Sequence, residues 1–298
     1  MSTNNEISII GCTNAGKSTL INRIFLKKVS IVSPMVQTTR NAIPNVFNNK
    51  LIIWDTPGIL KPKTKLDYFL INEMFESIKR SKTNILVVDS SQKINPHIKE
   101  ICNFLNKFND KKNLIVYSKI DLIKNQNEFS ELKKFFYNSL KEITDEFYLN
   151  LLYDDISILV NKIYEINSDS EDSIFIESIH DDWNDDLLIT EFIREQIIKH
   201  TSQEIPHSSS VIIEQKKYDN IANIFHIHCA IIVEKESQKK IIIGKCGSKI
   251  KEIGICSRKS ISNIYDCKIN LKLFCKVRKN WRNDDYLLKS FGYKKWQK

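Results

Sequence analysis

Short apolar runs alternate with segments of helical periodicity along the first half of the chain. Four runs, Ile7–Ile10, Leu51–Trp54, Asn84–Val88 and Leu114–Tyr117, have the length of buried strands. A stretch of helical period around residues 96–108 separates the last two runs. Strands that alternate with helices in this way predict an α/β architecture, a parallel sheet with helices on both faces.

Glycine is scarce in this sequence. At the usual share of roughly 7%, a chain of this length would hold about 20 glycines, whereas this chain of 298 residues has 7. Glycine is hardest to replace where φ must be positive or where a ligand approaches the main chain. Five of the seven fall in three short motifs of the kind that binds phosphate: Gly11, Gly16, Gly58, Gly244 and Gly247.

The first motif, GCTNAGKST, follows the strand Ile7–Ile10 and has the spacing of a phosphate-binding loop between a strand and a helix. Successive backbone N–H groups and a helix N-terminus must converge on the β-phosphate, which requires this spacing. Lys17 would reach the β- and γ-phosphates, and the Ser18 hydroxyl would bind Mg²⁺. The alternative is a chance glycine turn, which the flanking strand and helix disfavour. The candidate nucleotide-binding residues here are Gly11, Asn14, Ala15, Gly16, Lys17, Ser18 and Thr19.

The second motif, DTPG, begins at the end of the apolar run Leu51–Trp54. The Asp55 carboxylate can hold a metal there, and the Gly58 N–H can contact a γ-phosphate. Between the two motifs lies the polar loop VQTTRN, in which Thr38 or Thr39 could add a hydroxyl to Mg²⁺; we favour Thr39. The candidate magnesium ligands are therefore Ser18, Thr39 and Asp55, and the candidate catalytic groups are Lys17 and Gly58.

A third element, SKID, follows the strand Leu114–Tyr117 and places Ser118, Lys119 and Asp121 where doubly wound sheets bind ligands. Asp121 could accept two hydrogen bonds from N1 and N2 of guanine, an arrangement that adenine lacks. We therefore predict that these three residues contact a guanine nucleotide, and the spacing disfavours an ATP-using protein.

Positive charge is concentrated in the last third of the chain. Residues 211–298 hold 20 Lys plus Arg against 8 Asp plus Glu, a net charge of +12, whereas residues 1–210 carry a net charge of −3. This segregation indicates a part that meets polyanions, either nucleic acid or anionic lipid.

Cysteine and histidine provide no chemical motif. The seven cysteines are scattered and never spaced as CxxC, so we expect free thiols in a reducing compartment. His226 and His228 alternate on a predicted strand and could share a metal; without a third ligand we expect groove or surface histidines.

No apolar run approaches about 18 residues and the N-terminus lacks a basic signal region, so we expect a cytosolic protein.

The ordered set GxxxxGKS, TTR, DTPG and SKID, over residues 6–166, resembles the translation-factor-related class of GTPases. The blocks TEFIREQIIKHTSQEIPHSS, ESQKKIIIGKCGSKIKEIG and FCKVRKNWRNDDYLLKSFGY resemble the second domain of the Era family, bacterial GTPases that act in small ribosomal subunit assembly. The resemblance implies a P-loop GTPase domain with a mostly parallel doubly wound sheet at residues 1–170, a connector at 171–186, and a smaller α+β type II KH domain at 187–298.

The IIIGKCGSKIKEIG segment resembles the GxxG turn of a KH domain, which joins two helices and clamps single-stranded RNA. Glycines let phosphates approach main-chain N–H groups, and nearby lysines supply charge. The alternative is an ordinary glycine-capped helix turn on a solvated basic face. The candidate RNA-binding residues are Lys240, Gly244, Lys245, Gly247, Lys249 and Lys251.

The family resemblance implies a monomer that hydrolyses GTP to GDP with Mg²⁺ and binds the 3′ end region of small-subunit ribosomal RNA on the 30S subunit. It also implies peripheral contact with the cytoplasmic face of the inner membrane. Asn14 matches the asparagine that in this class helps to hold a potassium ion beside the phosphates. Ile59 follows Gly58 where Ras-like proteins have glutamine, so we expect slow intrinsic turnover.

Two departures from the family pattern leave a second hypothesis open. Ser118 stands where the family has asparagine, and we expect a serine to be too short to tie this loop to the phosphate loop. The segment FYLNLLYDD, residues 147–155, lacks the Ser-Ala pair of a second guanine-contacting loop, for which Asn150 is a weak substitute. The alternative function is therefore an RNA-binding scaffold whose GTPase domain has lost efficient nucleotide binding or hydrolysis.

Overall fold

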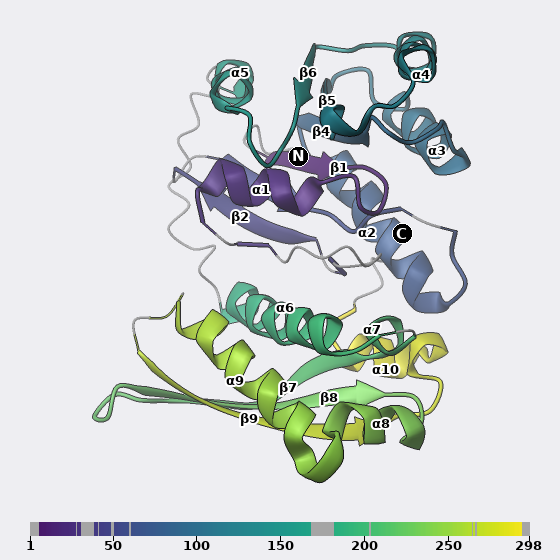
Figure 1. Cartoon of the computed structure of the whole chain (residues 1–298). Helices are drawn as coiled ribbons and strands as arrows, with labels where there is room; N and C mark the ends of the chain where they lie inside the picture. Colours follow the sequence, from purple (N-terminus) through teal and green to yellow (C-terminus); the bar gives the residue numbers. More distant parts are fainter. Residues whose placement is uncertain are drawn as a thin grey trace. The chain divides into compact units, whose positions relative to one another are not determined.

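The computed structural model describes residues 6–27, 29–30, 39–40, 42–48, 51–59, 61–167, 182–202, 204–263, 265 and 267–293. The chain divides into two compact units, one of residues 1–63 with 67–180 and one of residues 64–66 with 181–298 (Figure 1). Most of the predicted connector, the candidate Thr38 and the last five residues lie outside the described part.

The first unit contains a six-stranded sheet of order β2-β3-β1-β4-β5-β6. β2 runs antiparallel to β3, and all other neighbours are parallel, which confirms a mostly parallel doubly wound sheet. The strands are β1 (Glu6–Ile10), β2 (Ile43–Phe47), β3 (Leu51–Asp55), β4 (Thr83–Asp89), β5 (Lys112–Ser118) and β6 (Asp145–Leu149).

Helices cover both faces of this sheet. Successive side chains of a strand point to opposite faces, so the strands contribute to two separate apolar clusters, one on each face. The helical segments are α1 (Lys17–Phe25), α2 (Lys65–Arg80), α3 (Pro96–Leu105), the 3-10 turn η1 (Ile120–Leu122), α4 (Gln126–Ser139) and α5 (Ser157–Asn167). Ile7 and Ile9 of β1 belong to the cluster formed with α1 and α5, whereas Ile10 belongs to the cluster formed with α2, α3 and α4. The α3 helix begins where predicted because the Asn95 side chain accepts hydrogen bonds from two N–H groups of its first turn.

The second unit is a three-stranded sheet of order β7-β8-β9 with helices packed against it, an α+β arrangement (Figure 1). β7 (Ser210–Asp219) is antiparallel to β8 (Ile224–Val233), and β8 is parallel to β9 (Lys268–Val277). The helical segments are α6 (Asp182–His200), α7 (Ile205–Ser208), α8 (Glu236–Ile243), η2 (Lys245–Gly247), α9 (Ser248–Ser262), η3 (Trp281–Asn283) and α10 (Asp285–Ser290).

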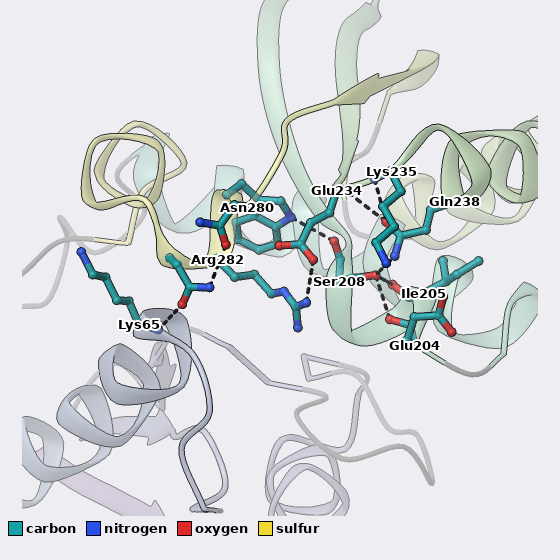
Figure 2. A network of polar contacts seen from close by, with 11 residues as sticks. Lys65, Glu204, Ile205, Ser208, Glu234, Lys235, Gln238, Asn280 and Arg282 are labelled. Atoms are coloured by element: carbon teal, nitrogen blue, oxygen red, sulfur yellow. Dashed lines mark hydrogen bonds and ion pairs between the residues drawn. The ribbon is translucent and has the colours of Figure 1, made fainter.

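A network of polar contacts joins Ser208, Glu234, Gln238 and Arg282 near the start of α8, as Figure 2 shows. Trp281 is fully buried, and its Nε1 donates to the Ser208 carbonyl at 2.9 Å. Gln238 of α8 donates to the Ser208 hydroxyl at 3.0 Å and accepts from the Glu234 N–H at 2.9 Å. The Arg282 guanidinium pairs with the Glu234 carboxylate at 2.6 Å. This network fixes the helix that leads into the GxxG turn.

Candidate nucleotide site and nucleic-acid interface

The loop between β1 and α1 has a backbone path that only glycine allows at two points. Gly11 has a φ of 147°, and a Cβ added there would lie 2.3 Å from the Val87 carbonyl oxygen. Gly16 has a φ of 102° and immediately precedes the first turn of α1. The loop therefore ends in the free N–H groups of a helix N-terminus, which is the arrangement that binds phosphate.

Lys17 lies inside this loop rather than on the surface. Its side chain is largely buried, and Nζ donates to the carbonyls of Gly11 at 3.2 Å and Cys12 at 2.8 Å. Burial lowers the pKa of the Lys17 ammonium, and the nearby Asp55 charge opposes that shift. A desolvated cation held among backbone groups interacts strongly with an incoming anion because little water screens the pair.

The three predicted magnesium ligands meet at one point. The Asp55 carboxylate, fully buried at the end of β3, accepts from the Ser18 hydroxyl at 3.4 Å and from the Thr39 hydroxyl at 3.2 Å. The two hydroxyl oxygens lie 3.3 Å apart. Carboxylate and hydroxyl oxygens are the ligand types that Mg²⁺ prefers. The donor set fits the metal, and residues from three separate segments supply it.

Sequence reasoning missed a third hydroxyl at this point. Ser30 is buried and donates to the same Asp55 oxygen that Ser18 and Thr39 contact. The Asn22 side chain of α1 holds this segment, donating to the Ser30 carbonyl and accepting from the Ser30 N–H, both at 2.8 Å. No motif links an asparagine to a serine eight residues later, so the sequence carried no signal for this contact.

The DTPG segment packs directly against the phosphate loop. A Cβ on Gly58 would lie 2.7 Å from the Thr13 Cα, so only glycine permits this approach. The next residue, Ile59, forms a parallel bridge with Cys12, and its N–H donates to the Gly11 carbonyl at 3.4 Å. The Ile59 side chain is buried in the apolar cluster that α2, α3 and α4 form with the sheet. It therefore lies in the core and supplies no polar group.

The prediction that Ser118 is too short to reach the phosphate loop is wrong. Its hydroxyl lies 2.6 Å from the Ala15 carbonyl and 3.0 Å from the Val88 carbonyl. A serine suffices because the end of β5 lies against the loop, so that a Cβ on Gly16 would be 3.8 Å from the Ser118 Cβ. The serine hydroxyl therefore connects β5 to the phosphate loop. We had expected that only the longer asparagine side chain could make this connection.

The other two residues of the SKID element, Lys119 and Asp121, follow the carboxyl end of β5, as predicted. Lys119 has a left-handed backbone conformation with a φ of 55°, and its Nζ pairs with the Asp89 carboxylate at 2.6 Å. Asp121 lies in the η1 turn with an exposed side chain. Its carboxylate is therefore accessible to solvent.

The loop after β6 is anchored by a residue that the sequence did not single out. Arg23 of α1 donates to the carbonyls of Leu151 at 3.0 Å and Asp154 at 2.6 Å. Asn150, the weak candidate for a guanine contact, uses its side-chain oxygen to accept from the Leu152 N–H at 3.0 Å. Asn150 therefore caps its own loop, and Arg23 fixes that loop beside the phosphate loop.

The GxxG turn joins α8 to α9, as predicted. Gly244 has a φ of 72°, and a Cβ there would lie 2.9 Å from the Lys249 N–H nitrogen. Gly247 has a φ of 77°, and a Cβ there would meet no atom within 4 Å. Lys240, Lys245 and Lys251 are exposed, whereas Lys249 is partly buried. The turn is therefore open to a ligand.

The described part of the chain contains no cluster of three His, Cys, Asp or Glu ligands and no membrane-spanning helix. His226 and His228, which we expected to be groove or surface histidines, line a groove on the sheet of the second unit. None of the described helices has the length and apolarity to cross a bilayer. All seven cysteines are free thiols.

Comparison with known proteins finds matches to both units. Residues 6–119 match a family described as 50S ribosome-binding GTPase, and residues 204–282 match the KH domain. The GTPase Era of Ureaplasma parvum serovar 3 is 38% identical, with 97% of this chain and 97% of that protein covered. The GTPase Era of Clostridioides difficile is 36% identical, with 96% and 97% covered.

Two solved structures resemble the whole chain. One is Era in complex with MgGDPNP and nucleotides 1506–1542 of 16S ribosomal RNA, with a TM-score of 0.86, 31% identity, and 97% of this chain and 98% of that chain covered. The other is a variant of Aquifex aeolicus Era bound to GDP·AlF4⁻, with a TM-score of 0.84, 30% identity and the same coverage.

Proposed function

Because the chain belongs to the Era family of GTPases, we propose that it binds and hydrolyses GTP at the phosphate loop and binds small-subunit ribosomal RNA through its KH domain. The observation that carries the nucleotide assignment is the convergence of Ser18, Thr39 and Asp55 beside the buried Lys17. These residues come from separate segments, and a structural core has no need of three oxygen ligands and a desolvated cation at one point.

Each group has a role in this proposal. The N–H groups of the loop cradle the phosphates, Lys17 neutralises charge that develops on the β- and γ-phosphates, and the Gly58 N–H orients the γ-phosphate. Bound magnesium, held by Ser18, Thr39 and Asp55, would neutralise phosphate charge. We assign the phosphate cradle to Gly11, Ala15, Gly16 and Thr19, and the guanine edge to Ser118, Lys119 and Asp121.

The buried Ile59 supports slow intrinsic turnover, since this position supplies no side chain to orient the attacking water. We propose that Asn14, exposed within the loop with a φ of 61°, helps to hold a potassium ion there. The measurement is GTP turnover in potassium against sodium chloride. Equal rates in the two salts would contradict the potassium site.

For the second unit, we propose that the GxxG turn clamps single-stranded RNA from the 3′ region of 16S ribosomal RNA, as the RNA bound to a relative suggests. The contacts would come from Lys240, Gly244, Lys245, Gly247, Lys249 and Lys251. The family description of the first unit names the 50S subunit, but 16S RNA belongs to the small subunit, so we assign the protein to 30S assembly.

We further propose that the protein is a monomer in peripheral contact with the inner membrane. Sedimentation with lipid vesicles tests the membrane contact.

Isothermal titration with Mg²⁺-GDP and with the RNA of nucleotides 1506–1542 tests this function. The wild-type chain should bind both, and Lys17→Ala should lose about 100-fold or more in nucleotide affinity while it keeps RNA affinity. Lys99→Ala, which removes an exposed lysine of α3, is the matched control. Normal RNA binding without any GDP binding in the wild type would instead favour the scaffold function.

A further inference from the structure

The KH sheet has one face covered by helices and one that is largely open. A Cβ on Gly254 of α9 would lie 3.6 Å from a Leu273 side-chain carbon, so Leu273 of β9 faces the helices. Successive side chains of a strand point to opposite faces. Asn270, Lys272 and Phe274 therefore lie on the opposite face, and all three are exposed.

Strand register extends this face across the sheet. His226 is paired with Asn270 on one side and Lys217 on the other, and the row beside it joins Gln215, His228 and Lys272. We call this surface the open face. Its members are Gln215, Lys217, Asp219, His226, His228, Lys268, Asn270, Lys272, Phe274 and Lys276.

The open face is basic along its length. Lys268, Lys272 and Lys276 recur every four residues on β9, which at about 3.3 Å per residue sets them about 13 Å apart. Two carboxylates lie among them. Glu214 pairs with Lys276, and Asp219 accepts the N–H groups of Ile221 and Ala222 at 3.0 Å in the turn after β7. The four lysines outnumber these two carboxylates, so the open face keeps a net positive charge that suits a polyanion.

The same face presents an exposed aromatic ring and a groove. Phe274 is 48% exposed, and its ring centroid lies 6.5 Å from that of His228. Beside it, a groove of about 280 Å³ is lined by Gln215, Lys217, Asp219, His226 and His228. Exposed rings on a basic sheet stack with nucleic-acid bases, and imidazole and amide groups can hydrogen-bond base edges. An acidic protein or a lipid surface would use the lysines but has no base to stack on Phe274.

We propose that the open face is a second RNA-binding surface of the KH domain, separate from the GxxG turn. It takes single-stranded RNA, with a base stacked on Phe274 and phosphates held by Lys217 and Lys272. The two surfaces are distinct because α9, which follows the turn, packs on the Leu273 side of the sheet. The inference rests on the proposed RNA binding and extends it, since an RNA that reaches both surfaces would bind more tightly than a short one.

Fluorescence anisotropy of the full chain with two labelled RNAs tests the inference. The long probe is nucleotides 1506–1542 of 16S ribosomal RNA, and the short probe is its last roughly eight nucleotides, enough for a GxxG clamp of about four. Phe274→Ala should weaken binding of the long probe about tenfold, and Lys272→Ala about threefold. Lys272→Ala should also reduce the slope of log affinity against log salt by about 0.7. Neither change should affect the short probe.

The control variants separate contact from folding. Phe274→Tyr keeps the ring and Lys272→Arg keeps the charge, so both should bind the long probe like the wild type. Lys99→Ala in α3 should leave both probes unaffected. Circular dichroism melts of all variants check that the sheet is intact.

Other outcomes overturn the inference. Phe274→Ala and Lys272→Ala with the wild-type affinity and salt slope for the long probe would do so. A loss confined to vesicles of phosphatidylglycerol, or to self-association in sedimentation velocity, would assign the face to lipid or to a second copy. If the wild type bound neither RNA, the proposed RNA function itself would fail.

Discussion

The phosphate loop and the GxxG turn use the same backbone chemistry in opposite surroundings. Both contain glycines with positive φ just before a helix, but a Cβ on Gly11 would strike Val87 whereas a Cβ on Gly247 would meet nothing within 4 Å. The lysine of the first site is buried and that of the second, Lys245, is exposed. An enclosed site suits one small anion of fixed shape, whereas an open site suits an extended chain of phosphates.

The largest expected effect is a contrast in folding between two glycine variants. Gly11→Ala should lower the free energy of unfolding by about 3 kcal/mol or more, because Cβ would overlap the Val87 carbonyl in addition to the φ strain. Gly247→Ala should cost only the backbone strain, about 1–2 kcal/mol. Urea denaturation measures both. Equal losses would mean that the two turns are enclosed alike.

A smaller effect is expected at the contact between β5 and the phosphate loop. Ser118→Ala removes the hydroxyl that lies 2.6 Å from the Ala15 carbonyl. One buried hydrogen bond contributes about 0.5–1.5 kcal/mol, so GDP affinity should fall about three- to tenfold in titration calorimetry. Ser130→Ala, at an exposed position of α4, is the control. An unchanged affinity would show that the serine does not support the loop in the bound state.

The Ser30 hydroxyl should influence magnesium more than nucleotide. Ser30→Ala removes a hydrogen bond that orients the Asp55 carboxylate, so the affinity of the site for magnesium should fall about threefold. The measurement is the magnesium concentration at which release of a fluorescent GDP analogue becomes slow. Affinity for GDP in EDTA should stay unchanged, because the Ser30 hydroxyl donates to the Asp55 carboxylate, which we assign to the metal rather than to the nucleotide. A parallel loss of metal-free affinity would instead indicate general disruption of the loop.

At the GxxG turn an equally small effect is expected, and it should depend on salt. Lys245→Ala removes one exposed charge and should reduce RNA affinity about threefold, with a salt slope lower by about 0.7. Lys259→Ala, at the far end of α9, provides the same loss of charge as a control. Binding of GDP to Lys245→Ala should be unaffected. A salt-independent loss would mean that Lys245 acts through packing.

Much of this molecule could be predicted because its motifs are short. The residues from Gly11 to Ser18 are adjacent in the chain, so their spacing alone defines a loop before a helix. The same holds for Gly244 to Gly247. Three of the four predicted strand runs agree with the structure to within a residue at each end, and the fourth, Leu114–Tyr117, begins two residues after β5 does. Such runs are visible because buried parallel strands are apolar on both faces.

The misses involve contacts between residues far apart in sequence. Ser118 reaches Ala15 across 103 residues, and Arg23 reaches Asp154 across 131. Whether a short hydroxyl spans such a gap depends on how closely β5 packs on the loop, a distance that no local pattern encodes. Ser30 was missed for the same reason, because its carboxylate partner lies 25 residues away.

The amino-acid sequence by itself determined which segments become strands, helices and glycine turns, and where positive charge accumulates, since these depend on side chains within a few residues of one another. Only the tertiary structure decided that three hydroxyl side chains meet at the Asp55 carboxylate, that Lys17 is desolvated, and that one face of the KH sheet stays open. Those features arise from packing of distant segments, in which displacements of an ångström change which polar atoms meet.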